Sequence, residues 1–361
     1  MDIFELMTVA KEKNASDLHL SVGSPPLIRV NGDLMNIDHF APMTTEELQA
    51  DFIQIATPDG LEKFQRDHEL DFKFTMADGT NLRCNAAMER GKLSLSVRLL
   101  PAVVRTIDEL QLPEMLKKLA VLERGLVVIS GPTGSGKTTT QAAIIEYINA
   151  NQTRHILSFE DPIEYSHVNI KSKITQRELG GDTYSFAEAM KHALRHDPDV
   201  IVVGEMRDSE TAGAVISMAE TGHLVISTGH APSAAQAVER IIDLFPYNER
   251  YLIQMRLASL LTAVFCQTLV PRLDGSGRIA AVEIMQVSSA IRNLIREGKL
   301  TLLADAIRDY GQNGNITMDE ALFKLYWQGI ITMETVLKFC RNPGEIGRLN
   351  TAILTNKKIQ T

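Results

Sequence analysis

The segment GLVVISGPTGSGKTTTQAAIIEYIN, residues 125–149, constrains the fold of this chain more than any other. It predicts a buried strand, a glycine-rich loop and a helix, because an apolar run is followed by glycines and then by helix-forming residues. The loop matches the pattern GxxxxGK[ST], in which backbone N–H groups and a helix N-terminus surround phosphates. We therefore expect the chain to bind ATP through Gly131, Pro132, Thr133, Gly134, Ser135, Gly136, Lys137, Thr138 and Thr139.

A phosphate loop of this kind needs a second strand that carries an acid. Lys137 is predicted to reach the β- and γ-phosphates and Thr138 to bind Mg²⁺. The segment DPDVIVVGEMRD, residues 197–208, supplies an apolar run followed by Glu205. Because α/β sheets bind ligands at the carboxyl ends of their strands, Glu205 is the candidate to orient or deprotonate the attacking water. The alternative is an exposed acid at a strand end.

A further acidic group follows another apolar run, in HILSFEDPIEY, residues 155–165. Glu160, Asp161 and Glu164 repel one another unless a cation or a chain of water molecules lies between them. Mg²⁺ that keeps most of its water is a natural partner for such a group. The alternative is a solvated turn, because Asp-Pro is typical turn chemistry.

The segment TGHLVISTGHA, residues 221–231, holds His223 and His230 at the two ends of an apolar run. Seven residues span roughly 23 Å in an extended strand, so one metal ion is not expected to bind both imidazoles. His230 is predicted at the carboxyl end of the strand, where an imidazole is suited to sense the γ-phosphate. His223 is predicted at the opposite end. From the residues alone, two strand-boundary histidines with local partners are an equal alternative.

The pattern of apolar runs divides the chain into regions. Residues 1–100 predict a small α+β domain with hairpins, and residues 101–112 a linker that contains prolines. Over residues 113–285, continuous apolar runs alternate with helical patterns, which indicates a parallel sheet covered by helices on both faces. Residues 286–345 are predicted to be helical, and residues 346–361 to form a flexible tail. The predicted fold class is α/β.

Composition argues against several functional classes. A net charge of −8 and 6% aromatic residues do not favour a nucleic-acid binder. Cys84, Cys266 and Cys340 form no CxxC pair, so a reducing cytosol is expected rather than a disulfide framework or a zinc site. The N-terminal residues lack the pattern of a signal peptide. The apolar run LASLLTAVFCQTLVP, residues 257–271, is too short and polar to span a bilayer and is predicted to be a core helix.

Four motifs, in their order along the chain, resemble those of one family. GPTGSGKTTT, HILSFEDPIEY, DPDVIVVGEMRD and AETGHLVISTGHA resemble the Walker A motif, Asp box, Walker B motif and His box of the secretion ATPases of type II secretion and type IV pilus machines. NASDLHLSVGSPPLIRVNGDL, ERIIDLFP and AIRNLIRE are similar to segments of PilT-type pilus retraction ATPases. Assembly ATPases of the superfamily have an extra N-terminal domain, and many have a four-cysteine zinc element. The absence of both from this sequence favours retraction.

The resemblance implies a homohexameric ring that hydrolyses ATP with Mg²⁺ and drives type IV pilus retraction. Each subunit would pair a PAS-like N-terminal domain with a RecA-like P-loop domain and a helical C-terminal region. Glu205 would be the catalytic glutamate, Glu164 an acid near metal and water, and His230 a residue on the γ-phosphate side. The full implied catalytic set is Glu205, Glu164, His230, His223, Arg83, Arg98 and Arg207.

The same resemblance implies partners and leaves alternatives. The ring would dock at the cytoplasmic face of the inner membrane on a pilus platform protein, with a second retraction ATPase as a further partner and no nucleic acid. An accessory PilU-like motor, a pilus assembly or secretion ATPase and, more distantly, a RecA-like nucleic-acid motor are alternatives. Two departures from the family pattern stand out. Gly229 replaces the usual leucine before His230, which predicts a looser turn, and the residues after Pro343 differ.

Overall fold

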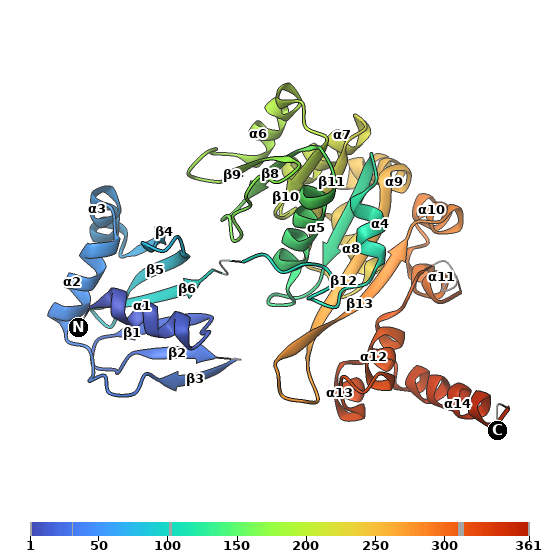
Figure 1. The fold of residues 1–361 in the computed structure, drawn as a ribbon. Coiled ribbons are helices and arrows are strands. Elements are labelled where there is room, and N and C mark those ends of the chain that lie inside the picture. Colours follow the sequence, from blue (N-terminus) through green and yellow to red (C-terminus); the bar gives the residue numbers. More distant parts are fainter. Residues whose placement is uncertain (1, 31, 101–102, 310–313, 360–361) are drawn as a thin grey trace. The chain divides into compact units, whose positions relative to one another are not determined.

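The computed structural model describes residues 2–30, 32–100, 103–309 and 314–359, with only the backbone described from residue 352 onward (Figure 1). The chain folds into two compact units. The N-terminal unit comprises Met1–Val103 together with Glu164–Ser166, and the C-terminal unit comprises Val104–Ile163 and His167–Thr361. Each unit has its own core, and each is described by itself below.

The N-terminal unit is an antiparallel sheet with helices packed on it. The strand order is β3-β2-β1-β6-β5-β4. The strands are β1 Asp17–Ser21, β2 Leu27–Val30, β3 Asp33–Asn36, β4 Glu69–Thr75, β5 Asn81–Glu89 and β6 Lys92–Leu99, and the helices are α1 Ile3–Glu12, α2 Thr45–Ile55 and α3 Pro58–Asp67. The α+β content predicted for residues 1–100 is present.

Local sequence signals explain these elements. In β5 and β6 buried residues alternate with partly exposed ones, so one face of the sheet packs on the core and the other stays polar. Helix α2 begins with a capping box, in which Thr44 and Glu47 satisfy each other's backbone N–H groups. Helix α1 buries Ile3, Leu6, Met7 and Ala10 at helical spacing in the same core.

The C-terminal unit is built on a seven-stranded sheet in the order β13-β12-β7-β11-β10-β8-β9. Only the pairing of β12 with β13 is antiparallel among the described strand pairs of this sheet. The strands are β7 Gly125–Ser130, β8 His155–Glu160, β9 Lys173–Glu178, β10 Val200–Val203, β11 Leu224–Thr228, β12 Leu261–Pro271 and β13 Arg278–Gln286. The predicted α/β class is confirmed.

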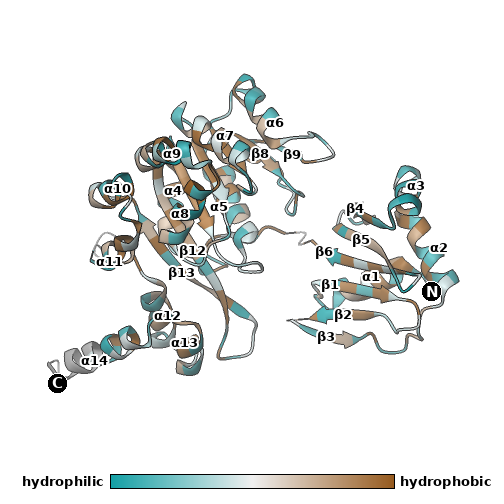
Figure 2. Ribbon diagram, turned by 180° about the vertical axis from the view of Figure 1, so that it is seen from behind, coloured by the Kyte–Doolittle hydropathy of each residue, from teal (hydrophilic) through white to brown (hydrophobic). Residues whose placement is uncertain are grey.

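Helices cover both faces of this sheet. The helices of the C-terminal unit are α4 Met115–Ala120, α5 Lys137–Asn151, α6 Phe186–Ala193, α7 Ser209–Glu220, α8 Ala234–Asp243, α9 Tyr247–Leu260, α10 Ser289–Arg296, α11 Leu303–Asp309, α12 Met318–Trp327, α13 Met333–Phe339 and α14 Pro343–Ile359, with short 3-10 turns Leu194–His196 and Leu300–Leu302. Alternate residues of β7 point into two different hydrophobic cores, one on each face of the sheet. Leu126 and Val128 belong to the first core, and Val127 and Ile129 belong to the second. The central strands are therefore apolar on both faces, as Figure 2 shows by their brown colour.

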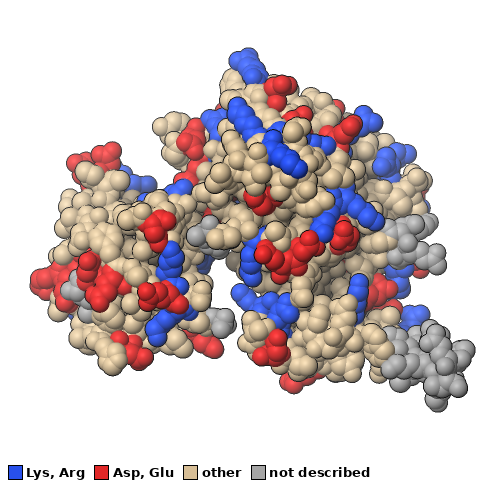
Figure 3. Space-filling model, viewed as in Figure 1, with Lys and Arg blue, Asp and Glu red and all other residues tan. Residues whose placement is uncertain are grey.

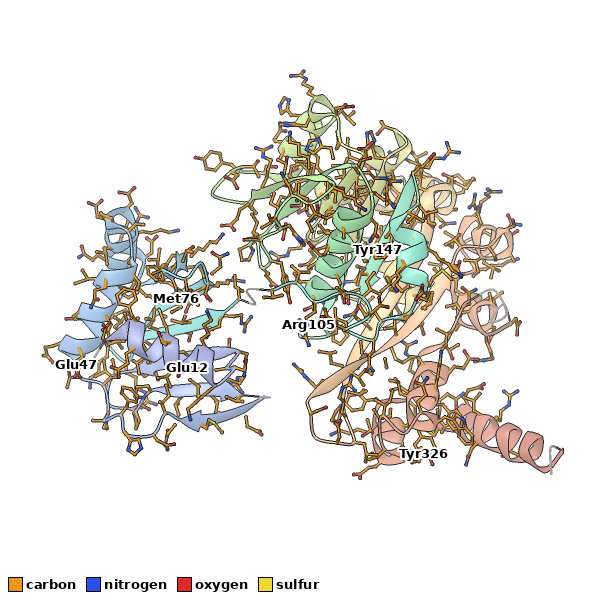
Figure 4. The ribbon with its side chains drawn as sticks, viewed as in Figure 1. Glu12, Glu47, Met76, Arg105, Tyr147 and Tyr326 are labelled. Carbon is orange, nitrogen blue, oxygen red and sulfur yellow. The ribbon has the colours of Figure 1, made fainter. Side chains whose placement is uncertain are left out.

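The second of these cores packs between the sheet and helices α4 and α5. It includes Ile144, Ile145 and Ile148 of α5 and Leu116 of α4. Tyr147, labelled on α5 in Figure 4, packs against the same cluster. Helix α5 is therefore held firmly on the sheet, and its N-terminus is fixed at the edge where β7 ends.

The apolar run at residues 257–271 corrects one prediction. Helix α9 ends at Leu260, and Leu261–Pro271 form strand β12 between β7 and β13. The run was predicted to be a core helix because it is apolar yet too short and too polar to span a bilayer, and its residues do not alternate as those of a half-buried strand do. The structure supplies the reason, since residues 263–267 of β12 are all buried. A strand buried on both faces has no period of two.

The C-terminal helices pack beside β13 and the extended part of β12. Met318, Leu322 and Phe323 of α12 share a cluster with Val336 of α13 and Ile346 of α14. We predicted a flexible tail from residue 346, whereas the structure continues a helix to Ile359 and buries Ile346. Tyr326, labelled on α12 in Figure 4, packs against this cluster. Across the described residues, no helix is both long and apolar enough to cross a membrane.

Candidate nucleotide site

The predicted phosphate loop connects β7 to α5 as expected. Gly136, at φ 85°, precedes the helix, and no side chain caps its first turn. By contrast, α6, α7, α8 and α10 each begin with a Ser or Asp side chain that accepts a hydrogen bond from the first turn. The N-terminus of α5 is therefore not covered by a capping side chain, and the helix dipole favours an anion there.

The glycine at the end of β7 is required by close packing. Gly131 has φ 147°, and a Cβ on it would lie 2.4 Å from the Gln267 carbonyl oxygen and 2.6 Å from Ser135 Oγ. Real side chains do not tolerate such distances, so only glycine fits at this position. The backbone of the loop is thus free to turn around a phosphate group without a side chain in the way.

Sequence reasoning missed Gln267, which braces the loop from β12. Its side-chain nitrogen donates to the Ser135 carbonyl oxygen at 2.6 Å, and its side-chain oxygen accepts from Thr140 Oγ1 at 2.9 Å. Gln267 is only 2% exposed. A polar residue inside an apolar run was the available signal, but the run had been assigned to a helix and Gln267 was not placed near the loop.

Lys137 holds the loop together from inside. Its ammonium group donates to the carbonyl oxygens of Gly131 at 3.0 Å and Pro132 at 3.1 Å. It also lies 3.5 Å from His230 Nδ1. These are weak partners for a full positive charge compared with phosphate oxygens, so the ammonium group is placed to exchange them for a nucleotide.

A chain of polar contacts runs from this lysine across the ends of three strands. His230 Nε2 lies 3.0 Å from Glu205 Oε1, and Arg207 Nε donates to Glu205 Oε2 at 2.8 Å. Arg207 also donates to Asp161 Oδ2 at 3.1 Å. The order Lys137, His230, Glu205, Arg207, Asp161 brings together residues predicted from the Walker A, Asp, Walker B and His motifs.

The hydrogen-bond geometry of this chain distinguishes between the two ring nitrogens of His230. If Lys137 donates to Nδ1, the neutral imidazole carries its proton on Nε2 and donates to Glu205. Both oxygens of Glu205 are then occupied, one by His230 and one by Arg207. The Glu205 carboxylate raises the pKa of Arg207 above its usual value, mainly through their hydrogen bond. The carboxylate is therefore held in place from two sides.

The turn that carries His230 is held firmly, although Gly229 had predicted looseness. Gly229 N donates to the Ile129 carbonyl oxygen at 3.0 Å. Ser130 Oγ donates to the Ala231 carbonyl oxygen at 2.9 Å and accepts from Ala231 N at 2.8 Å. A Cβ at position 229 would meet Ser130 Oγ at 3.7 Å, an ordinary contact. The glycine is therefore not required here, and it does not displace His230 from Glu205.

A cavity of about 180 Å³ opens beside Glu205 and His230. Helix α8 forms its far wall, and Arg240 of that helix donates to the His230 carbonyl oxygen. Arg207 also lines the cavity. The polar chain is therefore open on the α8 side, where Glu205 and Arg207 have room to change their contacts.

His223 lies away from this cluster. Its carbonyl oxygen accepts from Gly125 N, at the start of β7, whereas the phosphate loop follows the end of β7. Six strand residues span roughly 20 Å. The ring of His223 lies 2.9 Å from Thr221 Oγ1, which is a local partner. Within this chain the structure does not bring His223 to the site, and the strand-boundary alternative describes it.

The three carboxylates of the Asp box lie in three different surroundings. Glu160 is buried and accepts from Ser158 Oγ at 2.7 Å and from Gln176 Nε2 at 3.0 Å, which makes it a structural residue. Asp161 joins the polar chain through Arg207. Glu164 groups with the N-terminal unit, so the structure fixes no distance from Glu164 to the phosphate loop.

The predicted arginines of the N-terminal unit lie side by side. Arg83 on β5 and Arg98 on β6 are directly opposite each other. The register extends this pair into a row of five charged residues, the cross-strand charge row: Lys73, Arg83, Arg98, Asp17 and Arg29. Directly paired residues point to the same face. Arg98 Nε donates to Asp17 Oδ1 at 2.8 Å, so Asp17 holds Arg98.

The donor set near the loop fits a cation held largely by phosphate and water. No group of three or more His, Cys, Asp or Glu side chains among the described residues is arranged to hold a metal ion by itself. Mg²⁺ in nucleotide sites is usually bound through one or two protein ligands, phosphate oxygens and water. The Thr138 hydroxyl, at the start of α5, suits that role because it follows Lys137 directly.

Comparison with known proteins agrees with this arrangement. The sequence model of the family "Type II/IV secretion system protein" matches residues 5–338. The chain therefore belongs to that family, and the resemblance predicted from its four motifs is confirmed.

Within this family, the chain is similar to ATPases of type IV pilus systems. The chain is 41% identical over 343 residues to the type IV pilus retraction ATPase PilT of Pseudomonas aeruginosa, covering 95% of this chain and 99% of that protein. It is 40% identical over 337 residues to the type IV pilus ATPase PilU of the same organism, covering 93% of this chain and 88% of PilU. A crystal structure of the pilus retraction motor PilT with bound ADP superposes with a TM-score of 0.87 at 39% identity, covering 96% of this chain and 99% of that one.

Proposed function

We propose that this chain is the subunit of a homohexameric motor that hydrolyses ATP to drive type IV pilus retraction. The observation that carries the proposal is the polar chain from Lys137 to Asp161 beside an uncapped helix N-terminus. A phosphate cradle alone binds nucleotides. Hydrolysis also requires a group that activates water, and Glu205, held between an imidazole and a guanidinium after β10, can supply it.

The first step is the exchange of partners at Lys137. Phosphate oxygens attract the ammonium group more strongly than the Gly131 and Pro132 carbonyls, so ATP binding draws Lys137 away from His230. Nδ1 of His230 then loses its donor and is open to a phosphate oxygen or a water molecule. The first turn of α5, which no side chain caps, would receive the phosphates at its N-terminal end.

The second step frees Glu205. When Arg207 moves toward phosphate charge, one carboxylate oxygen of Glu205 is released to orient or deprotonate the attacking water. His230 keeps the other oxygen in place. Mg²⁺ held by Thr138, the phosphates and water would neutralise the developing negative charge. Glu164 is proposed as the acid on the far side of that water shell.

Arginines from the N-terminal unit of a neighbouring subunit are proposed to complete the site. Within the cross-strand charge row, Arg83 and Arg98 differ in their partners, which suggests different roles for the two arginines. Arg98 is bound by Asp17, whereas among the described residues no acceptor is found for the guanidinium group of Arg83. Arg83 is therefore the better candidate to reach the γ-phosphate. Arg98 is the better candidate to hold the neighbouring strands in register through its bond to Asp17.

The experiment that tests hydrolysis compares two glutamates. Glu205→Gln keeps the size of the side chain and one of its two acceptor oxygens but removes its basicity, so ATP binding should persist while turnover falls about 100-fold or more. Glu210→Gln, an exposed acid in the first turn of α7, is the matched control and should behave like wild type. Turnover by Glu205→Gln at the wild-type rate would refute the assignment.

Retraction itself requires a cellular test. The proposed partners are an inner-membrane pilus platform protein and a second retraction ATPase, with the ring docked at the cytoplasmic face and no nucleic acid bound. Figure 3 shows acidic and basic side chains interspersed over the face drawn, without a broad basic stripe. The gene should restore twitching to a host that lacks its own retraction motors, and the Glu205→Gln version should not.

An accessory motor is the second candidate, because the identities to PilT and PilU are nearly equal at 41% and 40%. The same host distinguishes the two. A principal motor restores retraction alone, whereas an accessory motor restores it only when a PilT-type partner is present.

A further inference from the structure

The loop between His230 and helix α8 is held from the far end of the chain. Arg341 follows α13 and donates through one guanidinium nitrogen to the Pro232 carbonyl oxygen and through the other to Glu283. Pro232 is two residues beyond His230. A planar guanidinium with two separate donors suits such a bridge, because it fixes the direction as well as the distance of both acceptors.

Glu283 is the buried centre of this contact. It lies on β13, and its side chain is 4% exposed. Its carboxylate also accepts from Ala234 N at 2.6 Å and from Met318 N at 3.3 Å. These are the first residues of α8 and α12, where the helix dipoles favour a negative charge. Glu283 therefore joins the start of α8 to the start of α12, and Arg341 supplies its countercharge.

The backbone of the Arg341 segment is fixed as well. Arg341 N and Asn342 N donate to the two carboxylate oxygens of Asp319 at 2.7 and 2.9 Å. Asp319 belongs to α12, so the turn between α13 and α14 is anchored to the same helix whose first residue Glu283 binds. Movement of the C-terminal helices is thereby transmitted to the guanidinium rather than absorbed by a loose turn.

We propose that Arg341 is a positioning residue for His230, tying the C-terminal helices α12–α14 to the loop that carries the imidazole. The inference rests on the proposed function, in which His230 faces the γ-phosphate. It goes beyond that function because it gives the C-terminal helices a route to the nucleotide site. The family match ends at residue 338, so Arg341 lies outside the segment that the family model covers.

The physical route is short. The Ser130 hydroxyl bonds both the N–H and the carbonyl oxygen of Ala231. The Arg341 guanidinium bonds the carbonyl oxygen of the next residue, Pro232. With both clamps present, the turn from His230 to helix α8 has one backbone conformation. Without Arg341 the start of α8 loses its brace, and His230 samples positions in which it no longer bonds Glu205.

The test uses three variants and one control. Arg341→Met removes both bonds, and Arg341→Lys retains one charge contact. The double variant Arg341→Met/Glu283→Gln removes the bridge without leaving a buried carboxylate uncompensated, so it should stay folded even if Arg341→Met does not. Arg348→Met is the control, because Arg348 is 76% exposed and pairs with Glu345 on its own helix.

Two readouts are expected to change together. Hydrogen exchange in a peptide spanning residues 229–236 should accelerate at least tenfold in Arg341→Met and in the double variant, with Arg341→Lys between them and wild type. The kcat for ATP should fall about tenfold in both, with KM within twofold of wild type. In a His230→Ala background, Arg341→Met should produce no further loss of kcat.

Opposite results overturn the proposal. If the double variant exchanges and turns over like wild type, Arg341 only balances the charge of Glu283. If the losses from His230→Ala and Arg341→Met are additive, the arginine does not act through the histidine. If wild type hydrolyses no ATP, the proposed function fails instead, and hydrogen exchange still decides whether Arg341 holds the loop.

Discussion

Replacing Gln267 by leucine tests whether the phosphate loop depends on a side chain outside its motif. The change keeps a similar volume but removes the donor to the Ser135 carbonyl and the acceptor for Thr140. Both partners are buried residues. The Thr140 hydroxyl has an alternative acceptor in the carbonyl four residues earlier, as threonine hydroxyls in helices commonly do. The Ser135 carbonyl loses the donor that Gln267 supplies, so we expect the larger part of the cost to fall on the loop.

The expected loss of ADP affinity follows from the Ser135 carbonyl group alone. An unsatisfied buried acceptor costs about 1–3 kcal/mol. If the free loop relaxes to avoid this cost, ADP binding has to return the loop to its original conformation and must supply the same free energy. The Kd for ADP is then weakened by about 5- to 150-fold. Titration calorimetry with ADP measures the change directly, and thermal unfolding of the free protein shows whether the loop relaxes at the expense of the whole domain.

A second buried glutamine provides the control. Gln141 on α5 is 3% exposed and makes one long hydrogen bond, at 3.4 Å, to the Val203 carbonyl oxygen. Gln141→Leu should lower stability slightly and leave ADP affinity within about threefold of wild type. If Gln267→Leu binds ADP as tightly as wild type, the brace has no part in organising the loop, and the reasoning from its contacts is refuted.

Three further predictions concern the same unit. Gly131→Ala, whose Cβ would lie 2.4 Å from a backbone oxygen, should weaken ADP binding at least about tenfold by calorimetry, whereas Gly229→Ala, with only ordinary contacts, should leave ATP turnover within twofold. Ser130→Ala leaves the buried Ala231 N–H without its acceptor and should lower unfolding free energy by about 1–3 kcal/mol in denaturant titration; an unchanged midpoint would contradict it. Burial lowers the pKa of His167 despite its hydrogen bond to Glu146, so the unfolded state binds more protons. Stability should therefore fall as pH drops through the unfolded value near 6.5, and His167→Gln should flatten that loss in melting curves.

Much of the fold followed from the sequence because its signals were local. The loop from Gly131 to Lys137 is a contiguous pattern, and the strands before it are short apolar runs. Strand β12 was not predictable in this way, because burial on both faces removes the alternation that marks a strand. Its Thr, Val and Phe content after residue 261 favours a strand and was the signal available.

The site was predictable where chemistry is carried by a motif and not where it depends on packing. Glu205 and His230 were each predicted at the carboxyl end of a strand, and the structure adds that these strands are neighbours and that the two side chains lie 3.0 Å apart. Gln267 and Arg341 act through contacts with residues more than 100 positions away, on strands and helices whose neighbours depend on sheet order. His223 shares a motif with His230, yet five strand residues separate their ends of the sheet.

The cross-strand charge row ties the stability of the N-terminal sheet to a single carboxylate. Lys73, Arg83 and Arg98 occupy three neighbouring strands in direct register, and like charges so placed repel. Asp17 pairs with Arg98 at 2.8 Å and lies 4.0 Å from Arg29, so it offsets part of that repulsion. Because added salt screens the repulsion and the ion pairs alike, over roughly 10 Å at 0.1 M, the sheet should depend only weakly on ionic strength as long as Asp17 keeps its charge.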